Sequence, residues 1–237
     1  MERKKLIIVR HGERIDEINP MEWLNYCKTN YNERSIEFNS RLDDPHLTND
    51  GLIQAQEVAE SILHELQGID IPYIYCSKLI RAVQTAYYIA LRLSKPIVVS
   101  KGFALTAAAV GNAGNSFNFL SIDEIRGFCP DIEIIDGDVE ESYLIPSDNW
   151  HYPLKHVINN HSVSLVVAHR ETIRNLARER LKTPYCCYGI FDIPVDDENN
   201  PQLNMIKLEA LMQRDRNRIH NEPPKVHKKG LFNFSFS

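Results

Sequence analysis

Four short apolar runs, each rich in β-branched residues, alternate along this chain with longer segments that carry apolar residues at helical spacing. The runs are residues 4–10 (KKLIIVR), 71–76 (IPYIYC), 96–99 (PIVV) and 163–168 (VSLVVA). Short buried strands that alternate with helices are typical of a mostly parallel sheet covered by helices. We therefore predict a three-layer α/β fold, built as one domain over residues 1–212.

Three segments have the periodicity and the end signals of helices. Residues 49–66 follow Thr48, a residue type that caps helix N-termini, and repeat apolar residues every three or four positions. Residues 78–93 and 170–181 begin directly after the second and fourth predicted strands. Near the end, GIFDIPV and LNMIKLEAL flank the turn-forming DDENNPQ, which predicts a closing β-hairpin.

Two long stretches do not fit this alternation. Residues 15–47 are polar and aromatic, and residues 102–150 contain small and then acidic side chains. Segments of this length inside a compact domain are usually functional lids or are disordered, and the aromatic residues favour packed lids. Residues 213–237 begin with a polar stretch that is interrupted by proline, and we expect them to form a flexible C-terminal tail.

Composition excludes several classes of partner. A net charge of −5 and a sequence pI near 6.0 leave no basic face of the kind that binds nucleic acid. No apolar stretch approaches the roughly 18 residues of a membrane span, and the first apolar run is too short for a signal peptide. Five cysteines without a repeated CxxC indicate neither a disulfide framework nor a zinc site. We expect a cytoplasmic protein without metal, cofactor, nucleic-acid or membrane partners.

Charged side chains follow three of the predicted strands. The first strand ends in RHGER (residues 10–14), the second runs into Ser77 and a helix that carries Arg81, and the fourth ends in HRE (residues 169–171). The carboxyl ends of parallel strands and the N-termini of the following helices meet at one ligand-binding edge of a sheet. The sequence therefore brings two histidines and three arginines together: His11, His169, Arg10, Arg14 and Arg81.

This set of side chains has the chemistry of a phosphate site. A phosphate monoester carries about −1.5 to −2 charges at neutral pH, and guanidinium groups bind its oxygens bidentately. A neutral imidazole at His11 can act as the nucleophile, while Arg10 and His169 donate to the oxygens in the transition state. Gly12 would let the backbone leave the strand and approach the ligand closely. Each histidine alone has a structural alternative, a satisfied residue at the edge of the core, and Arg81 alone could be an exposed helix residue.

The motifs RHGER after a short strand, LTNDGLIQAQ, YCSKLIRAVQTA and VVAH resemble the histidine phosphatase superfamily, also called phosphoglycerate mutase-like, over roughly residues 4–210. They are most similar to the branch of the suppressor of T-cell receptor signalling proteins and the ecdysteroid-phosphate phosphatases. The resemblance implies a phosphoglycerate mutase-like fold and a phosphate pocket of Arg10, Arg14, Arg81 and His169. It also implies that His11 is the residue that becomes phosphorylated.

One position departs from the pattern of that branch. Its members carry a glutamate shortly after the third strand, which protonates the leaving oxygen, whereas alignment of GFALT by eye places Leu105 there. General acid catalysis typically contributes about 10²–10⁴ in rate, most for strongly basic alkoxide leaving groups. The departure predicts activity that is weak on alkyl esters and better preserved on aryl and acyl phosphates.

Other carboxylic acids are candidates to replace the missing donor. Glu171 lies two residues after His169, where other branches of the superfamily place an acidic donor, although a solvated glutamate at a helix start is the more ordinary interpretation. Glu13 is a poorer candidate because neighbouring arginines keep it ionised. Asp123 and Glu124 reach the pocket only if their segment folds over it.

Three functions are consistent with these residues. The first is a metal-independent phosphomonoester hydrolase that acts through a phosphohistidine on His11. The second is a pseudophosphatase that binds a phosphorylated ligand without turnover. The third, a phosphomutase, is disfavoured because mutases of the superfamily carry an asparagine a few residues after RHG, where this chain reads Glu-Arg-Ile-Asp. The expected partner is a phosphorylated small molecule or a phosphoprotein, and the oligomeric state, including a homodimer, is left open.

Overall fold

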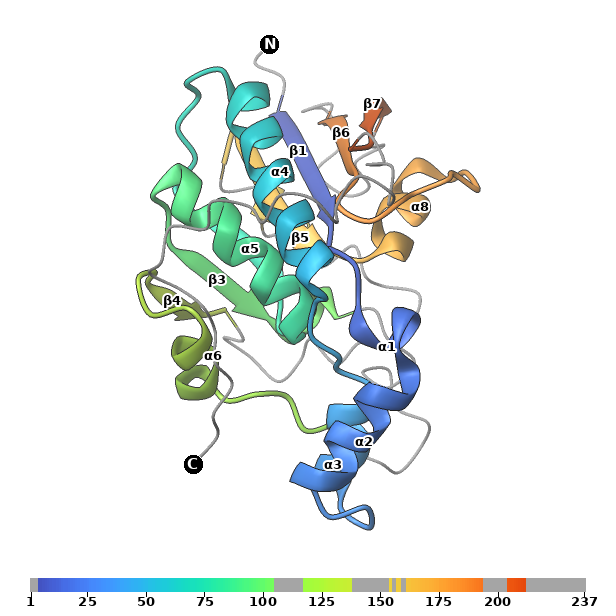
Figure 1. The fold of residues 1–237 in the computed structure, drawn as a ribbon. Coiled ribbons are helices and arrows are strands. Elements are labelled where there is room, and N and C mark those ends of the chain that lie inside the picture. The colour runs from blue at the N-terminus through green and yellow to red at the C-terminus, as the bar shows by residue number, and fades with distance from the viewer. Residues whose placement is uncertain are drawn as a thin grey trace, which may run out of the picture.

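The computed structural model describes residues 4–104, 117–137, 154, 157–158, 161–193 and 204–211. Its strands form one seven-stranded sheet in the order β4-β3-β2-β5-β1-β6-β7 (Figure 1). The strands are β1 (Lys4–Arg10), β2 (Ile74–Ser77), β3 (Ile97–Ser100), β4 (Ile134–Asp136), β5 (Val163–Ala168), β6 (Tyr188–Ile193) and β7 (Asn204–Glu209). The pairs from β4 to β1 are parallel, whereas β6 pairs antiparallel with both β1 and β7. The predicted α/β fold with a mostly parallel sheet is confirmed.

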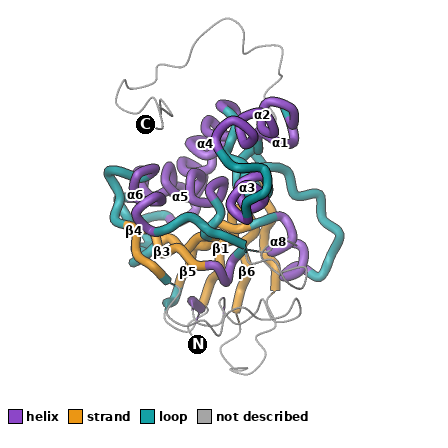
Figure 2. The backbone as a smooth tube through the Cα atoms, turned by 90° about the horizontal axis from the view of Figure 1, so that it is seen from below, coloured by secondary structure: helices purple, strands orange, loops and turns teal. Residues whose placement is uncertain are grey.

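Helices cover both faces of the sheet. They are α1 (Ile15–Ile18), α2 (Pro20–Asn30), α3 (Ile36–Leu42), α4 (Asn49–Leu66), α5 (Ile80–Leu93), α6 (Ile122–Phe128) and α8 (Arg170–Ala177), with a 3-10 turn η1 (Lys101–Phe103). Figure 2 shows α4, α5 and α6 together on one face of the strands. None of the helices among the described residues is long and apolar enough to cross a membrane.

The two faces of β1 belong to two different hydrophobic clusters, as the period of two in a strand requires. Ile7 and Val9 pack with residues of α4 and α5. Leu6 and Ile8 pack with Ile173 of α8 and with other residues on the opposite face. Full burial of one such side chain contributes about 1.5–3 kcal/mol, so the charged end of β1 extends from a firmly anchored strand.

The predicted element bounds agree with the structure at some ends and differ at others. The strands at 4–10 and 163–168 and the helix at 49–66 have the predicted limits, and the closing hairpin of β6 and β7 is present. The second and third strands begin later than predicted, at Ile74 and Ile97, and α5 begins at Ile80. The helix predicted over 170–181 ends at Ala177, because Arg178 adopts the left-handed conformation, with φ of 55°.

The segment 15–47, predicted as a polar and aromatic insertion, forms α1, α2 and α3. Ser35 caps α3 by accepting a hydrogen bond from the backbone N–H of Phe38, and Trp23, Cys27 and Phe38 form a small hydrophobic cluster separate from the main core. Figure 1 shows these helices beyond the C-terminal end of β1, away from the strands.

Part of the second predicted insertion, 102–150, also forms a helix and a strand that the sequence did not predict. It contains α6, which begins with a capping box of Ser121 and Glu124, and the edge strand β4. Residues 105–116 and 138–150 of this insertion lie outside the described residues, as does the predicted tail 213–237.

Candidate active site

His11 and His169 lie side by side because they follow neighbouring parallel strands. Arg10 of β1 is in register with Ala168 of β5, and each histidine comes one residue later. The backbone N–H of His11 also donates to the carbonyl of Ala168 at 3.1 Å. The two rings are 5.3 Å apart between centroids, and each residue is 3% exposed. The predicted meeting of the two histidines at one edge of the sheet is therefore observed.

The His11 ring is held in one tautomer. Its Nδ1 lies 2.8 Å from the carbonyl oxygen of Gly12, which can only accept, so Nδ1 carries the proton and Nε2 keeps a lone pair. Burial holds the pKa of His11 well below its ordinary value of 6.5, and the positive charge of Arg81 and the neighbouring His169 lower it further. His11 is therefore a neutral imidazole at physiological pH.

His169 is fixed by a hydroxyl from a third strand. Its Nε2 lies 3.0 Å from Oγ of Ser77, a fully buried residue at the end of β2. Burial lowers the pKa of His169 well below 6.5, and the charges of Arg81, Arg14 and Arg10 act in the same direction. All three predicted arginines are therefore close enough to act electrostatically on this ring.

Gly12 is required by packing against another glycine. A Cβ atom on Gly12 would lie 2.5 Å from the carbonyl oxygen of Gly51, and a Cβ on Gly51 would lie 2.3 Å from the carbonyl oxygen of Glu13. Both contacts involve backbone atoms that cannot yield easily. Gly12 thus makes a close approach to the first turn of α4, and the approach to a ligand that the sequence suggested stays a prediction. The same contact brings the N-terminus of α4 against the loop that carries His11.

Arg10 is clamped by the loop that precedes β6. Its Nη1 donates to the carbonyl oxygen of Thr183 at 2.6 Å, and its Cζ lies 3.9 Å from the centre of the Tyr185 ring. A cation over an aromatic face is attracted by the ring quadrupole. The buried Nε of Arg10 has no hydrogen-bond partner within the described ranges.

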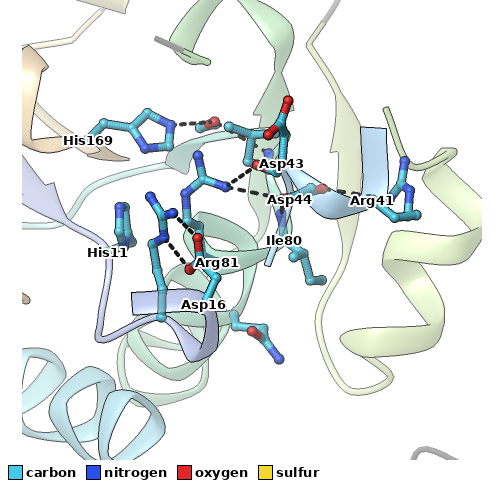
Figure 3. Close-up of polar contacts among 12 residues, drawn as sticks. His11, Asp16, Arg41, Asp43, Asp44, Ile80, Arg81 and His169 are labelled. Atoms are coloured by element: carbon cyan, nitrogen blue, oxygen red, sulfur yellow. Dashed lines mark hydrogen bonds and ion pairs between the residues drawn. The ribbon is translucent and has the colours of Figure 1, made fainter. Parts of the chain in front are cut away.

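Arg81, the second residue of α5, is held in a similar way and is 2% exposed. Its Nη1 lies 3.4 Å from Oδ1 of Asp44 and 3.3 Å from the carbonyl oxygen of Asp43 (Figure 3). As in Arg10, the buried Nε finds no partner among the residues that the structure describes. A buried donor without a partner costs about 1–3 kcal/mol, and more when it is charged. Both guanidinium groups therefore keep a buried donor that no described residue satisfies.

Arg14, the third predicted arginine, has carboxylate partners of its own. Its Nε donates to Oδ1 of Asp16 at 2.9 Å, and its Nη2 donates to Oδ2 of the same carboxylate. Its Nη1 lies 3.7 Å from Oε1 of Glu17, whose other oxygen accepts from the Tyr185 hydroxyl. In this state, the planar fork of Arg14 binds an internal carboxylate.

Comparison with known proteins agrees with this arrangement of motifs. Residues 6–104, which include most of β1, all of α4 and α5 and four of the five clustered residues, match the family described as the histidine phosphatase superfamily (branch 1). The similarity to the histidine phosphatase superfamily thus covers 99 of the 237 residues.

One relative extends the similarity beyond that segment, and a second is more similar over a shorter stretch. Human ubiquitin-associated and SH3 domain-containing protein A is 26% identical over 94% of this chain, but the match spans only 38% of the relative's length. The mouse protein B of the same name is 34% identical over 102 residues, 37% of this chain and 16% of the relative. The chain therefore spans well under half the length of the curated relatives it matches.

Solved structures show the same fold. The ecdysone phosphate phosphatase from Bombix mori, crystallised with tungstate, superposes with a TM-score of 0.59 at 17% identity, covering 91% of this chain and 97% of the other. At this identity the likeness concerns the arrangement of the sheet and helices. It confirms the predicted phosphoglycerate mutase-like fold.

The predicted substitute acid is ionised. Burial alone would raise the pKa of Glu171, but a hydrogen bond from Arg170 and the charge of that residue outweigh burial and lower it. Oε1 of Glu171 lies 2.8 Å from Nε of Arg170, and both side chains are about half exposed. Glu171 thus has the features of a solvated glutamate at a helix start, without a proton to donate near neutral pH.

The other acids considered from the sequence are also engaged. Oε1 of Glu13 accepts from the Thr48 hydroxyl at 3.0 Å. Asp123 pairs with Arg126, and Glu124 caps α6. Leu105, where the acid of the related branch is expected, lies outside the described residues. Within the described ranges, no group of three or more His, Cys, Asp or Glu side chains could hold a metal ion.

Two residues of this site were missed in the sequence, and a third, Ser77, was placed at the binding edge without a role. Asp44 and Tyr185 hold two of the arginines, and Ser77 contacts His169. Asp44 offered a signal, because it stands in the DDPHLTNDG stretch that leads into α4. Tyr185 offered none, since nothing local indicates that the loop before β6 returns to the end of β1.

Proposed function

We propose that this chain is a phosphomonoester hydrolase that acts through a phosphohistidine on His11. One observation carries the proposal. The neutral His11, with its lone pair on Nε2, is buried with two guanidinium groups, those of Arg10 and Arg81, whose buried Nε donors have no described partner. A tetrahedral oxyanion supplies the acceptors for these donors and places phosphorus beside the nucleophile.

In the first step, Nε2 of His11 attacks phosphorus, and the bond between phosphorus and the leaving oxygen breaks with its electron pair on that oxygen. In the second step, a water oxygen attacks the phosphohistidine, the phosphorus–nitrogen bond breaks, and the lone pair returns to Nε2. One proton of that water stays on the phosphate, and the other passes to solvent, which supplies the proton that the leaving oxygen takes up. The products are the alcohol or phenol and inorganic phosphate. Arg10, Arg81 and His169 stabilise the charge on the equatorial oxygens in both steps.

Arg14 contributes only after it exchanges partners. Its bidentate edge binds Asp16 in this structure, so a phosphate that binds there displaces the carboxylate. The planar carboxylate of Asp16 and a tetrahedral phosphate both present oxygens that suit the same pair of Arg14 donors. We propose that Arg14 closes onto the bound phosphate by this exchange.

The leaving oxygen lacks a protonated carboxylic acid among the described residues. Glu171 is ion-paired with a lowered pKa, and Asp16 and Glu17 contact Arg14. We propose that turnover favours aryl and acyl phosphates, whose leaving groups need no proton. General acid catalysis typically contributes about 10²–10⁴, which sets the expected disadvantage of alkyl phosphates.

A pseudophosphatase is the second candidate. The same engaged carboxylates favour it, because a site with phosphate ligands and no proton donor can bind a phosphorylated small molecule or phosphoprotein without releasing the alcohol. We place either activity in the cytoplasm and without a metal requirement.

Hydrolysis of p-nitrophenyl phosphate in the presence of a metal chelator tests the proposal. We expect the wild-type chain to release nitrophenol, and His11→Ala to be inactive. His64→Ala, which removes an exposed histidine from the last turn of α4, is the matched control and should retain full activity. Equal rates in wild type and His11→Ala would overturn the hydrolase proposal. Tight phosphate binding without turnover would favour the pseudophosphatase.

A further inference from the structure

We infer that Asp44 is a positioning residue of this site, which holds Arg81 in the orientation that binds phosphate and joins it to α3. The inference rests on the proposed phosphate site, and it adds a residue that touches neither phosphate nor the reacting atoms. Asp44 is 2% exposed and lies in the turn between α3 and α4.

One oxygen of Asp44 organises the start of α5. Oδ1 accepts from the backbone N–H of Ile80 at 2.8 Å and lies 3.4 Å from Nη1 of Arg81. Nη1 of Arg81 also donates to the carbonyl oxygen of Asp43 at 3.3 Å. Arg81 is thus held at Nη1, while its buried Nε has no partner in the part of the chain that the structure describes. The carboxylate supports the guanidinium from the side away from its unpaired donor.

The other oxygen of Asp44 faces α3. Oδ2 lies 3.6 Å from Nη1 of Arg41, whose side chain is 8% exposed. Nη2 of Arg41 donates to the carbonyl oxygen of Asn118, and the backbone N–H of Asn118 donates to Oγ of Ser40 at 2.8 Å. One carboxylate therefore connects Arg81 with α3 and, through Arg41, with Asn118 in the stretch that leads into α6. Figure 3 shows Asp44 between Arg81 and Arg41.

A negative charge is needed between these two buried cations. Without it, Arg41 and Arg81 would repel each other in a medium that screens charge poorly. Burial raises the pKa of Asp44 to about 6, although the charges of Arg81 and Arg41, the backbone N–H of Ile80 and the more distant Arg14 all lower it. The Asp44 carboxylate is therefore mostly ionised at pH 7.5, the pH chosen for the phosphate-binding measurements.

The experiment is a double-mutant cycle on the binding of inorganic phosphate, measured by calorimetry. Asp44→Asn keeps an acceptor for the N–H of Ile80 and removes the charge, so it separates a helix-capping role from a positioning role. We expect a phosphate Kd at least about tenfold weaker than in wild type, with KM for p-nitrophenyl phosphate raised more than kcat is lowered. In an Arg81→Gln background, Asp44→Asn should change Kd by less than about twofold. Asp123→Asn, at an exposed carboxylate of α6, should leave Kd unchanged.

Three outcomes would overturn the inference. Unchanged Kd in Asp44→Asn would reduce Asp44 to a cap of α5. Tighter binding would mean that Asp44 competes with phosphate. An equal loss in the presence and absence of Arg81 would show that Asp44 does not act through it. A wild-type chain that binds no phosphate would overturn the proposed function as well, whereas the first three results leave that function intact.

A second measurement keeps the inference testable if Asp44→Asn does not fold. In the wild-type chain, the Asp44 Cγ and Arg81 Nε resonances are followed by NMR during a phosphate titration, with Arg81→Lys used for assignment. We expect both resonances to shift with the same midpoint. An Asp44 Cγ resonance that does not respond to saturating phosphate would overturn the inference.

Discussion

Arg81 and Arg14 are both paired with a carboxylate, but the two pairs have opposite geometry. Asp44 contacts Arg81 at Nη1 and leaves Nε unpaired, whereas Asp16 covers the Nε and Nη2 edge of Arg14. The first carboxylate is fully buried and the second is about a quarter exposed. A buried acid that holds a cation from behind prepares it for a ligand, while an accessible acid on the binding edge occupies the place of one. The Arg81 side of the site is preformed, and the Arg14 side must open.

The largest expected effect concerns the general acid, which neither the Arg81 side nor the Arg14 side of the site supplies. By the family resemblance, Leu105→Glu places a carboxylic acid at the leaving oxygen. We expect kcat/KM for an alkyl phosphate to rise by about 10²–10⁴, with a much smaller gain for p-nitrophenyl phosphate.

Glu171→Gln is the control for this gain, because Glu171 is already ionised. It should slow alkyl and aryl phosphates to the same small extent. A selective loss on alkyl phosphates in Glu171→Gln would restore that residue as the acid.

The preformed side is tested next through His169. His169→Ala removes a donor to the equatorial oxygens and should lower kcat for p-nitrophenyl phosphate by about 10²–10³. Ser77→Ala removes only the hydroxyl that fixes the His169 ring and should cost less than His169→Ala. Steady-state kinetics on both variants check this order. A larger loss in Ser77→Ala would mean that the hydroxyl itself contacts the substrate.

The side that must open is tested through Asp16. Asp16→Asn weakens the partner that phosphate displaces from Arg14, so we expect the Kd of inorganic phosphate to tighten about threefold, in the range of an exposed ion pair. Glu22→Gln, on the exposed side of α2, is the control and should leave Kd unchanged. Weaker binding in Asp16→Asn would erase the contrast with Asp44, because Asp16 would then also position its arginine.

A further effect is on stability rather than on catalysis or phosphate binding. The two histidines are neutral in the folded chain, with pKa values well below 6.5, whereas the unfolded chain protonates them below about pH 6.5. Their contribution is therefore complete above pH 6.5 and is lost as the pH falls, by up to about 1 kcal/mol per histidine and pH unit.

Urea unfolding between pH 7.5 and 5.5 measures this loss. A His11→Ala, His169→Ala double variant should lose less stability over this range than wild type. The raised pKa of Asp44 acts in the opposite direction over part of the range, but it is common to both chains and cancels in the comparison. Parallel stability curves would show that the histidines are not held neutral.

The sequence predicted those features that depend on local pattern. Strand β1, helix α4 and the placement of His11 and His169 follow from apolar periodicity, a capping threonine and the rule that parallel strands end at one edge. The role of Asp44 depends on its contact with Arg81, which lies 37 residues later in the sequence. The role of Tyr185 depends on a distant loop that returns to Arg10. The helices α1 to α3 were missed because their apolar residues form a small separate cluster, with too few positions for a clear period.

The most direct test of the account is to trap the phosphorylated intermediate. The wild-type chain is mixed with p-nitrophenyl phosphate, quenched in base and digested, and the phosphorylated peptide is sequenced by mass spectrometry. We predict an acid-labile phosphoryl group on His11 that forms and decays at the rate of turnover. Turnover without any phosphohistidine, or with the phosphoryl group on another residue, would contradict it.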